Sequence, residues 1–331
     1  MAESKVSSKR SDDDLFVVIL AGGIGSRFWP ASTPSRPKQL LALATDSPLV
    51  VDTFRRGAGI VPVNQVRLLA NARLTAAFQA LPEQWEDDVY WVEPRARGTC
   101  PALAWAAWSI ERECPGAVMI SLHSDHLIEP LDDFQRTISA AVELARNREI
   151  LVCIGAVPDR IETGYGHIQP GESIPLESEI EASTVSAFHE KPNATNAERY
   201  LQEGYLWNTG MFVWKASTFL NEVRVNAPEI GACLPLLEES PEAFFDAVPE
   251  GPVDTMVLER SACVGVVQAS FSWDDMGSWE SLARNRAPDE DHNVVVGDGT
   301  VREGSNNIVF SEAGQVVLFG VDNLVVVRTD E

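Results

Sequence analysis

Short apolar runs alternate with stretches of helical periodicity along the first half of the chain. The runs have the length and β-branched content of strands buried on both faces, and the intervening stretches carry apolar residues at the spacing of one helix face. This alternation predicts an α/β fold with a doubly wound, mostly parallel sheet whose functional residues follow the strands' carboxyl ends. We expect strands at 15–20, 66–70, 89–92, 117–122 and 150–156, and helices at 49–60, 71–81, 102–110 and 131–147.

The alternation loosens after residue 156 and changes again near residue 293. Helices are expected at 216–226 and at about 229–248, followed by short apolar runs broken by Gly, Asn and Asp at 294–296, 308–310, 316–319 and 324–327. We therefore predict a small all-β appendage after a large α/β domain. The expected boundaries are a disordered tail at 1–14, a catalytic domain at 15–288 with halves at about 15–150 and 151–288, and a small β domain at 289–331.

Charge and cysteine usage exclude several classes of partner. The 331 residues include 49 Asp and Glu against 26 Lys and Arg, and the net charge of −23 argues against binding nucleic acid or an anionic membrane. No run reaches the roughly 18 apolar residues of a membrane span, and Asp12, Asp13 and Asp14 interrupt the positive start that a signal peptide needs. Five widely spaced cysteines without a C-x-x-C pair suit a reduced compartment, so we expect a cytoplasmic protein.

The strand at 15–20 leads into a loop with the chemistry of an anion site. Gly22, Gly23 and Gly25 permit positive φ and a close approach of backbone N–H groups to a ligand, and Arg27 and Lys38 add positive charge. The alternative is a tight strand-to-helix turn with two solvated cations. The loop lacks both the Gly-Lys-Ser/Thr end of a P-loop and the third glycine of a dinucleotide fingerprint.

The segment AGGIGSRFWPASTPSRPKQ resembles the signature loop of the sugar nucleotidyltransferases, specifically that of the mannose-1-phosphate guanylyltransferase family. The resemblance runs from Leu15 to Thr329 and rests on at least six motifs in the family's order. It implies a Rossmann-like nucleotidyltransferase fold, GTP and mannose 1-phosphate as substrates, Mg²⁺ as cofactor, and a homodimer. Relatives usually continue with another strand beyond the position of Glu331, so a truncated β domain is left open.

Nucleotide contacts are implied at two places in the first half. The segment EPRARGTCP at 93–101 resembles the family's E-P-x-x-R-[NG]-T-A-P, which lies over the nucleotide. From the residue types alone, Thr99 is expected to cap the following helix, whose N-terminus favours anions. The implied nucleotide-binding residues are Leu20, Ala21, Gly22, Gly23, Gly25, Arg97, Gly98 and Thr99.

The strand at 117–122 ends in HSDH, for which two interpretations compete. With Ser121 in the first position it resembles the H-x-H-x-D-H motif of dinuclear zinc hydrolases, but only His167, His189 and His292 remain to complete two metal shells. It also resembles the guanylyltransferases' P-A-D-H, whose aspartate binds Mg²⁺ and here is Asp125.

A second metal-binding aspartate is implied near residue 275. FSWDDMGSW at 271–279 resembles the family's F-x-W-S-D-V-G-S-W and places Asp275 on that aspartate. Carboxylates suit Mg²⁺, which prefers one or two of them together with phosphate oxygens and water. The resemblance therefore implies Asp125 and Asp275 as a metal-binding pair.

Three motifs of the second half imply contacts to the sugar. TGYGHI at 163–168, FHEKP at 188–192 and WNTGMF at 207–212 resemble the family's T-G-Y-G-Y-I, F-x-E-K-P and W-N-S-G-M-F. VDTMVLER at 253–260 matches I-D-Y-x-V-M-E-K only partly. Glu190 would accept from sugar hydroxyls and Lys191 would hold the sugar phosphate, although an exposed ion pair of little energetic value is the alternative. The implied sugar-binding residues are Tyr165, Gly166, Glu190, Lys191 and Asn208.

The reaction implied by the resemblance is attack of mannose 1-phosphate on the α-phosphorus of GTP, giving GDP-mannose and pyrophosphate. Such a step needs positioning and charge neutralisation, which we assign to Arg27, Lys38 and Lys191 as catalytic residues. Three alternatives stay open: another hexose-1-phosphate nucleotidyltransferase, such as a glucose 1-phosphate enzyme using UTP or dTTP, a metal-dependent hydrolase, and a non-catalytic sugar-nucleotide-binding subunit.

Overall fold

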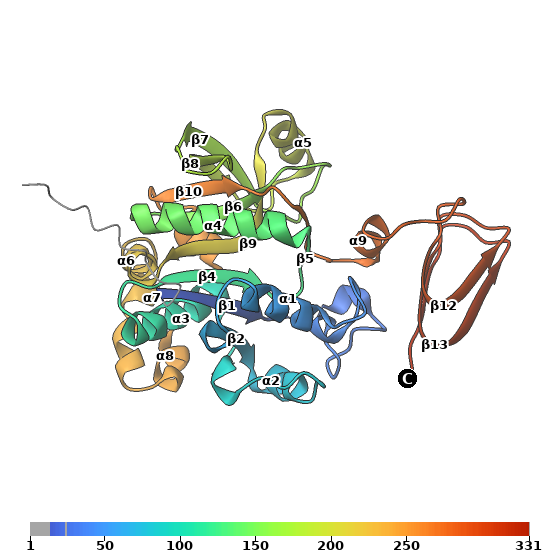
Figure 1. Ribbon diagram of the computed structural model, residues 1–331, viewed down its shortest axis with the longest axis horizontal. Coiled ribbons are helices and arrows are strands. Elements are labelled where there is room, and N and C mark those ends of the chain that lie inside the picture. The colour runs from blue at the N-terminus through green and yellow to red at the C-terminus, as the bar shows by residue number, and fades with distance from the viewer. Residues whose placement is uncertain (1–13, 24, 331) are drawn as a thin grey trace, which may run out of the picture.

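A nine-stranded sheet runs through the molecule in the order β3-β2-β1-β4-β9-β6-β10-β8-β7 (Figure 1). The computed structural model describes residues 14–23 and 25–330, so the predicted tail lies outside the described residues except for Asp14. The strands are β1 (Leu15–Ala21), β2 (Val66–Asn71), β3 (Tyr90–Glu93), β4 (Val118–His123), β6 (Leu151–Ala156), β7 (His167–Ser173), β8 (Ala182–His189), β9 (Leu206–Lys215) and β10 (Val264–Gln268).

The sheet is mixed, with a parallel half that holds the glycine loop. β3, β2, β1 and β4 are mutually parallel, and β10 is parallel to β6. β9 is antiparallel to both β4 and β6, and β7 and β8 form an antiparallel pair at the edge. The predicted α/β fold with a doubly wound, mostly parallel sheet and a β appendage is thereby confirmed, with the antiparallel strands confined to the second half.

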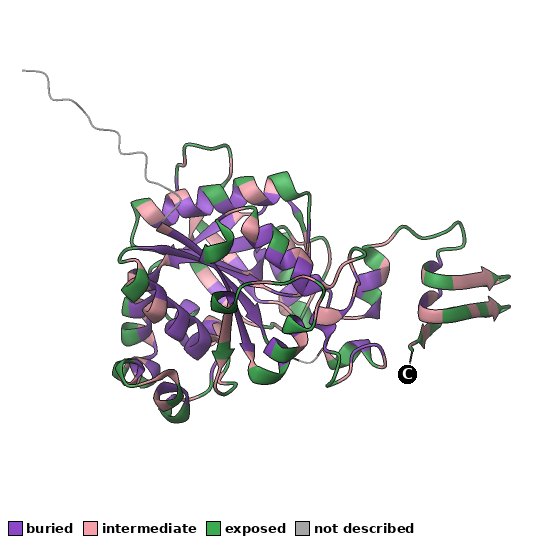
Figure 2. Cartoon of the chain, turned by 60° about the horizontal axis from the view of Figure 1, so that its bottom comes forward, coloured by how far each residue is buried: buried purple, intermediate pink, exposed green. Residues whose placement is uncertain are grey.

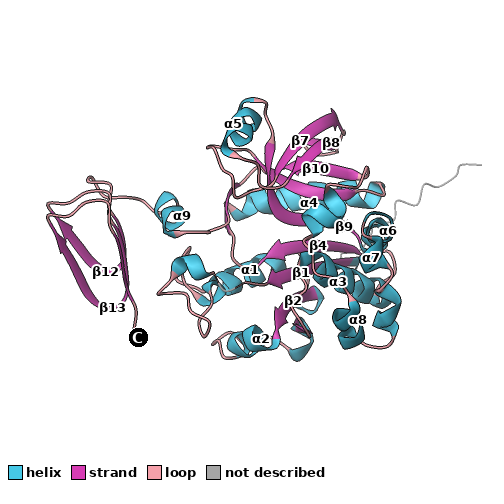
Figure 3. Ribbon diagram, turned by 180° about the vertical axis from the view of Figure 1, so that it is seen from behind, coloured by secondary structure: helices cyan, strands magenta, loops and turns pink. Residues whose placement is uncertain are grey.

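Helices cover both faces of the sheet because β1 is apolar on both sides (Figure 3). Val17 and Ile19 pack in a core with α1 (Leu49–Ala58), α2 (Ala72–Gln79) and α4 (Leu131–Asn147). Phe16, Val18 and Leu20 point the other way, because side chains alternate along a strand. They pack in a core with α3 (Thr99–Glu113), α6 (Ala216–Asn226) and α8 (Pro241–Ala247). None of the helices in the described part of the chain combines the length and apolar character needed to span a membrane.

The prediction of a single helix at about 229–248 is wrong. The segment contains α7 (Pro228–Gly231), a 3-10 turn (Leu234–Glu238) and α8 instead. Pro235 and Pro241 explain the breaks, since proline lacks the N–H that a helix interior needs and is tolerated only in a first turn. Apolar periodicity alone did not reveal these interruptions.

The C-terminal residues form a separate parallel sheet of β12 (Val294–Arg302), β13 (Ile308–Phe319) and β14 (Val325–Arg328) beside the main body (Figure 2). The runs expected at 308–310 and 316–319 are one strand, β13. A third apolar core joins this sheet to the main body: Phe28, after the glycine loop, packs on Trp279 of α9 (Trp279–Arg284), and Trp279 packs on Phe310 of β13. The appendage thus supports the segment that follows the glycine loop.

Candidate active site

One lysine lies between the two predicted metal-binding aspartates. Lys38 Nζ is 2.9 Å from Asp125 Oδ2 and donates to the backbone oxygen of Asp275 at 2.7 Å. Asp125 follows β4, and Asp275 follows β11 (Ser272–Asp274), which pairs with β5 (Leu127–Glu129) in an antiparallel ribbon. Because this ribbon ties the two loops together, residues that are distant in the sequence meet at the carboxyl end of β4.

The glycine loop lies directly over Lys38. Gly23 and Gly25 have φ of 82° and 69°, and a Cβ on Gly25 would lie 2.4 Å from Lys38 Cβ. Gln39 donates to the carbonyl oxygen of Gly22 at 2.7 Å. Gly25 is therefore needed for both conformation and space, and Gly23 for conformation. Arg27 lies on the turn that follows, and its side chain is exposed.

The donor set around Lys38 suits a hard divalent cation. The Asp125 carboxylate and the backbone oxygen of Asp275 both face the positive Nζ, and oxygen atoms of this kind are the ligands that a hard divalent cation takes. The ligand atoms of His123, Asp125 and His126 also lie within 4.8 Å of one another, the only such group of three or more found among the described residues.

His126 is a poor partner for zinc in this arrangement. Its Nδ1 accepts from the indole N–H of Trp273 at 3.1 Å, so the proton of the neutral ring resides on Nε2. Burial holds the pKa of His126 well below its usual range, so the ring stays neutral. A ring with one nitrogen accepting and the other protonated has no free lone pair for a metal, which weighs against the hydrolase alternative.

Tyr165 contacts the Asp275 carboxylate. Its hydroxyl donates to Asp275 Oδ1 at 2.8 Å, although the family resemblance implied a place at the sugar. On the other side of this carboxylate, a Cβ on Gly277 would lie 2.8 Å from Oδ1 and 2.7 Å from Oδ2. Asp275 is thus held between a phenol and a backbone that leaves no room for a side chain.

The remaining predicted sugar-binding residues form a second cluster. A Cβ on Gly166 would lie 2.8 Å from Glu190 Oε2 and 3.2 Å from Asn208 Cβ. Lys191 pairs with Glu190 at 2.7 Å and has 65% of its side chain exposed. Glu190 therefore lies between the backbone that leads into β7 and a solvated ammonium group.

Asp254 belongs to this cluster and was not predicted as a site residue. It accepts from Asn208 Nδ2 at 2.8 Å, while Asn208 Oδ1 accepts from the N–H of Gly210 at 3.1 Å. Burial, and then the charge of Glu190, raises the pKa of Asp254 to about 6. The partial match of VDTMVLER to a family motif was the only signal in the sequence that could have drawn attention to this residue.

The predicted nucleotide-contacting residues before α3 are held by the segment 245–253. Arg97 Nε donates to the carbonyl oxygen of Phe245 at 2.9 Å. The predicted N-cap at Thr99 is wrong: Gly98, at φ 82°, is the cap residue, and Thr99 Oγ1 accepts from the N–H of Val253 at 2.9 Å. A Cβ on Gly98 would lie 2.6 Å from the carbonyl oxygen of Gly251, which explains glycine at the helix start.

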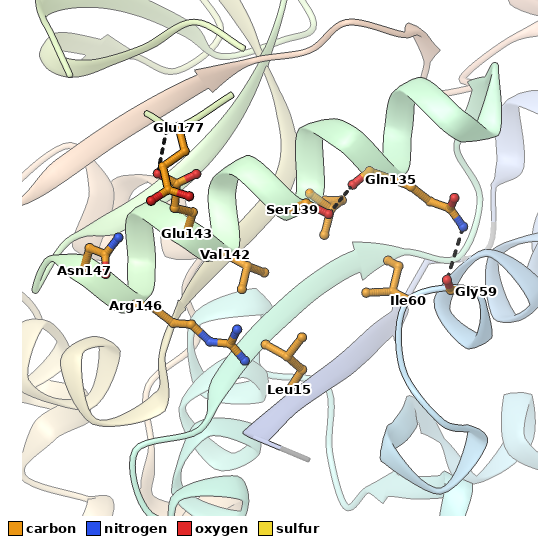
Figure 4. Close-up of a pocket in the computed structure, with 11 residues that line it drawn as sticks. Leu15, Gly59, Ile60, Gln135, Ser139, Val142, Glu143, Arg146, Asn147 and Glu177 are labelled. Carbon is orange, nitrogen blue, oxygen red and sulfur yellow. Dashed lines mark hydrogen bonds between the residues drawn. The ribbon is translucent and has the colours of Figure 1, made fainter. Parts of the chain in front are cut away.

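Another cleft, of about 700 Å³, runs along α4 and contains none of the predicted site residues (Figure 4). Leu15 lines it, so it lies at the amino end of β1, opposite the edge that bears the glycine loop. Its one cation, Arg146, is paired with Asp14. The chemistry expected from the sequence is therefore confined to the carboxyl edge of the sheet.

Known proteins resemble this chain over almost its whole length. Residues 16–292 match the family model described as nucleotidyl transferase. The mannose-1-phosphate guanylyltransferase of Escherichia coli strain K12 is 36% identical over 96% of this chain and 69% of that protein. The alginate biosynthesis protein AlgA of Pseudomonas aeruginosa is 34% identical over 95% of this chain and 67% of that protein.

The fold comparison agrees with the sequence comparison. The crystal structure of mannose-1-phosphate geranyltransferase from Thermus thermophilus superposes with a TM-score of 0.87 at 29% identity, covering 96% of this chain and 93% of that one. The chain spans about two thirds of the length of the two relatives named above. From the family model, the identities and the fold, the chain belongs to the nucleotidyl transferase family and is a relative of the E. coli mannose-1-phosphate guanylyltransferase.

Proposed function

We propose that this protein is a mannose-1-phosphate guanylyltransferase that converts GTP and mannose 1-phosphate to GDP-mannose and pyrophosphate. The observation that supports this most directly is Lys38, which lies under the glycine loop and contacts the carboxylate of Asp125 and the backbone oxygen of Asp275. A positive Nζ beside a carboxylate and beneath a glycine-lined loop suits the binding of a triphosphate and a divalent metal. The identity of 36% to the E. coli guanylyltransferase supports the choice of substrates.

The chain's own residues act by binding and by neutralising charge. Lys38, Arg27 and the N–H groups of the glycine loop would hold the departing pyrophosphate. When the triphosphate binds, Lys38 exchanges its partner Asp125 for a phosphate oxygen. Before that, the carboxylate of Asp125 compensates the buried charge of Lys38. No general base is needed, because the attacking phosphate monoester is already ionised at pH 7.

Asp125 and Asp275 would hold Mg²⁺, which when bound supplies further positive charge to the phosphate oxygens. The role of the second cluster is to orient the sugar. Glu190 would accept from sugar hydroxyls, and Asn208 retains one N–H and one lone pair after its bonds to Asp254 and Gly210. Lys191, with its exposed ammonium group, would bind the sugar phosphate.

The proposed protein is a homodimer in the cytoplasm. The family resemblance supports a homodimer, which light scattering of the purified chain would test directly. The five widely spaced cysteines, none of them in a C-x-x-C pair, support a reducing, cytoplasmic compartment.

The deciding experiment measures pyrophosphate release with Mg²⁺ across a matrix of GTP, UTP and dTTP against mannose 1-phosphate and glucose 1-phosphate. We expect the highest kcat/KM for GTP with mannose 1-phosphate. Asp275→Asn should lower kcat by about 10²–10³, as loss of one preorganised charge contact typically does. Faster turnover with UTP or dTTP and glucose 1-phosphate would identify a different nucleotidyltransferase, and no release with any pair would contradict the enzyme assignment.

A further inference from the structure

Arg160 lies in the loop after β6 and stacks on the aromatic residues beside the candidate metal site. Its guanidinium carbon is 4.7 Å from the ring centre of Trp207 and 5.9 Å from that of Tyr165. Only 24% of its side chain is exposed. None of the sequence motifs assigned a role to this residue.

The charge of Arg160 is already balanced by carboxylates. Its guanidinium nitrogens lie 2.8 Å from Asp159, 3.7 Å from Glu162 and 3.9 Å from Asp274. A cation with three such neighbours has little net charge to offer a phosphate group. Arg160 is therefore better suited to holding a neighbouring group than to binding an anionic substrate.

That neighbouring group is the Tyr165 hydroxyl. Arg160 Nη2 lies 3.4 Å from Tyr165 Oη, which in turn is 2.8 Å from Asp275 Oδ1. A guanidinium can only donate, and an ionised carboxylate can only accept. The phenol therefore accepts from Arg160 and directs its single proton to Asp275, so the guanidinium and the carboxylate together fix the direction of the O–H bond.

The phenol has little freedom to turn away. Its ring packs edge-on against Trp207 and Trp273, with centroid distances of 5.3 and 4.9 Å. Its proton occupies one lone pair of Oδ1, and Lys38 holds the backbone oxygen of the same residue. Asp275 is thus fixed at both its backbone and its carboxylate before any substrate arrives.

We propose that Arg160 is a positioning residue that acts through the Tyr165 phenol to orient the Asp275 carboxylate toward the divalent cation. The inference rests on the proposed metal role of Asp275. Partners that orient a ligating carboxylate typically change metal affinity by roughly 10–100-fold when they are removed. Arg160 and Tyr165 form one chain of contacts, so their effects on metal affinity must not be independent.

The test measures Mn²⁺ binding to the whole 331-residue chain, without substrates, by electron paramagnetic resonance, which requires no turnover. We expect Tyr165→Phe and Arg160→Gln each to weaken Mn²⁺ binding by roughly 10–100-fold. The double variant should bind no more weakly than Tyr165→Phe alone. Tyr165→Phe keeps the ring and its packing, so it is expected to remain folded; the melting temperature of each variant checks this.

Arg112→Gln is the matched control. Arg112 also stacks on a tryptophan, 4.6 Å from the ring centre of Trp108, and pairs with Glu238. Because it lies near the end of α3, its loss should leave Mn²⁺ affinity unchanged. Unchanged affinity in Tyr165→Phe, or additive losses in the double variant, would overturn the inference. Wild-type affinity in Asp275→Asn would instead show that the proposed metal site itself is wrong.

Discussion

Single residues in this site act mainly by leaving space or by directing a proton. Gly277 shows the first case, since its backbone lies against both oxygens of the Asp275 carboxylate. A Cβ on Gly277 would meet only the carboxylate end of the Asp275 side chain, which can move. A methyl group at this position should therefore displace the carboxylate at little cost to folding.

We predict that Gly277→Ala lowers kcat by at least about tenfold, as expected when a charged group loses its preorganised position, while the melting temperature changes little. Steady-state kinetics and thermal unfolding of the same preparation measure both quantities. Gly59→Ala is the control, because Gly59 has an ordinary φ of −80° and the nearest atom to an added Cβ is the amide end of Gln135 at 3.2 Å. A large loss of stability with unchanged kcat in Gly277→Ala would refute this interpretation.

Glu93, at the end of β3, gives a prediction that depends on pH. Burial raises its pKa from 4.5 to about 7 in the folded protein. Between pH 4.5 and about 7 the unfolded chain loses this proton more readily than the folded protein does. The free energy of unfolding therefore falls as pH rises through this range, and the decrease is complete above the folded pKa. Glu93→Gln removes the effect.

We therefore expect Glu93→Gln to be more stable than the wild type at pH 8 by about 1–3 kcal/mol and nearly equal to it at about pH 4.5. Chemical denaturation at the two pH values measures the difference. Glu86→Gln serves as the comparison, because the side chain of Glu86 is exposed. An equal effect of Glu93→Gln at both pH values would exclude burial of the charge as its cause.

At the scale of elements, short connections bring the site together more than the large sheet does. The ribbon of β5 and β11 brings Asp125 and Asp275 to the same lysine. The C-terminal sheet reaches the glycine loop through Phe310, Trp279 and Phe28 in succession. Each of these contacts joins segments that are far apart in the sequence, so none is visible as a local pattern.

We predict that Phe310→Ala destabilises the protein by about 3 kcal/mol and also lowers activity, because it removes packing behind the segment that follows the glycine loop. Phe319→Ala is the matched control in the same strand: Phe310 is 4% exposed and Phe319 is 67% exposed, so the second change should have little effect on either property. Denaturant unfolding and kcat measure the two effects. Equal results for both variants would show that the third core does not support the site.

The whole molecule is strongly acidic, although its proposed substrates are anions. With a net charge of −23 the protein repels GTP, and the carboxylates of the chain also repel one another. The contact between Lys38 and Asp125 joins a buried and a partly buried group, and such pairs are screened much less than exposed charges. Salt should therefore weaken the long-range repulsion more than the local attraction.

We predict that raising NaCl from about 0.01 to about 0.1 M, which shortens the screening length from about 30 to about 10 Å, increases the melting temperature and lowers the KM for GTP. The same titration with sucrose in place of salt separates screening from general solute effects. A lower melting temperature or a higher KM in salt would show that local attraction dominates at this scale.

Local patterns in the chain were enough to establish the order and type of most elements. Apolar periodicity placed β1, β2, β4 and α4 within a residue or two, because burial on one or both faces leaves a direct pattern in the chain. Periodicity failed where two prolines interrupt an apolar stretch. Residue type failed at the start of α3, where Gly98 rather than Thr99 is the cap residue. The glycine loop and the two aspartates could be named from motifs, because each motif is contiguous.

Only the tertiary structure decided which of those residues meet and which atoms their protons point to. Tyr165, predicted to contact the sugar, also donates to Asp275, which no motif indicated. Arg160 and Asp254 had no predicted role, and their contacts appear only in the folded chain. The physical reason is that a hydrogen bond or an ion pair depends on distances of about 3 Å between groups. Sequence separation carries no information on such distances once the chain has crossed the sheet.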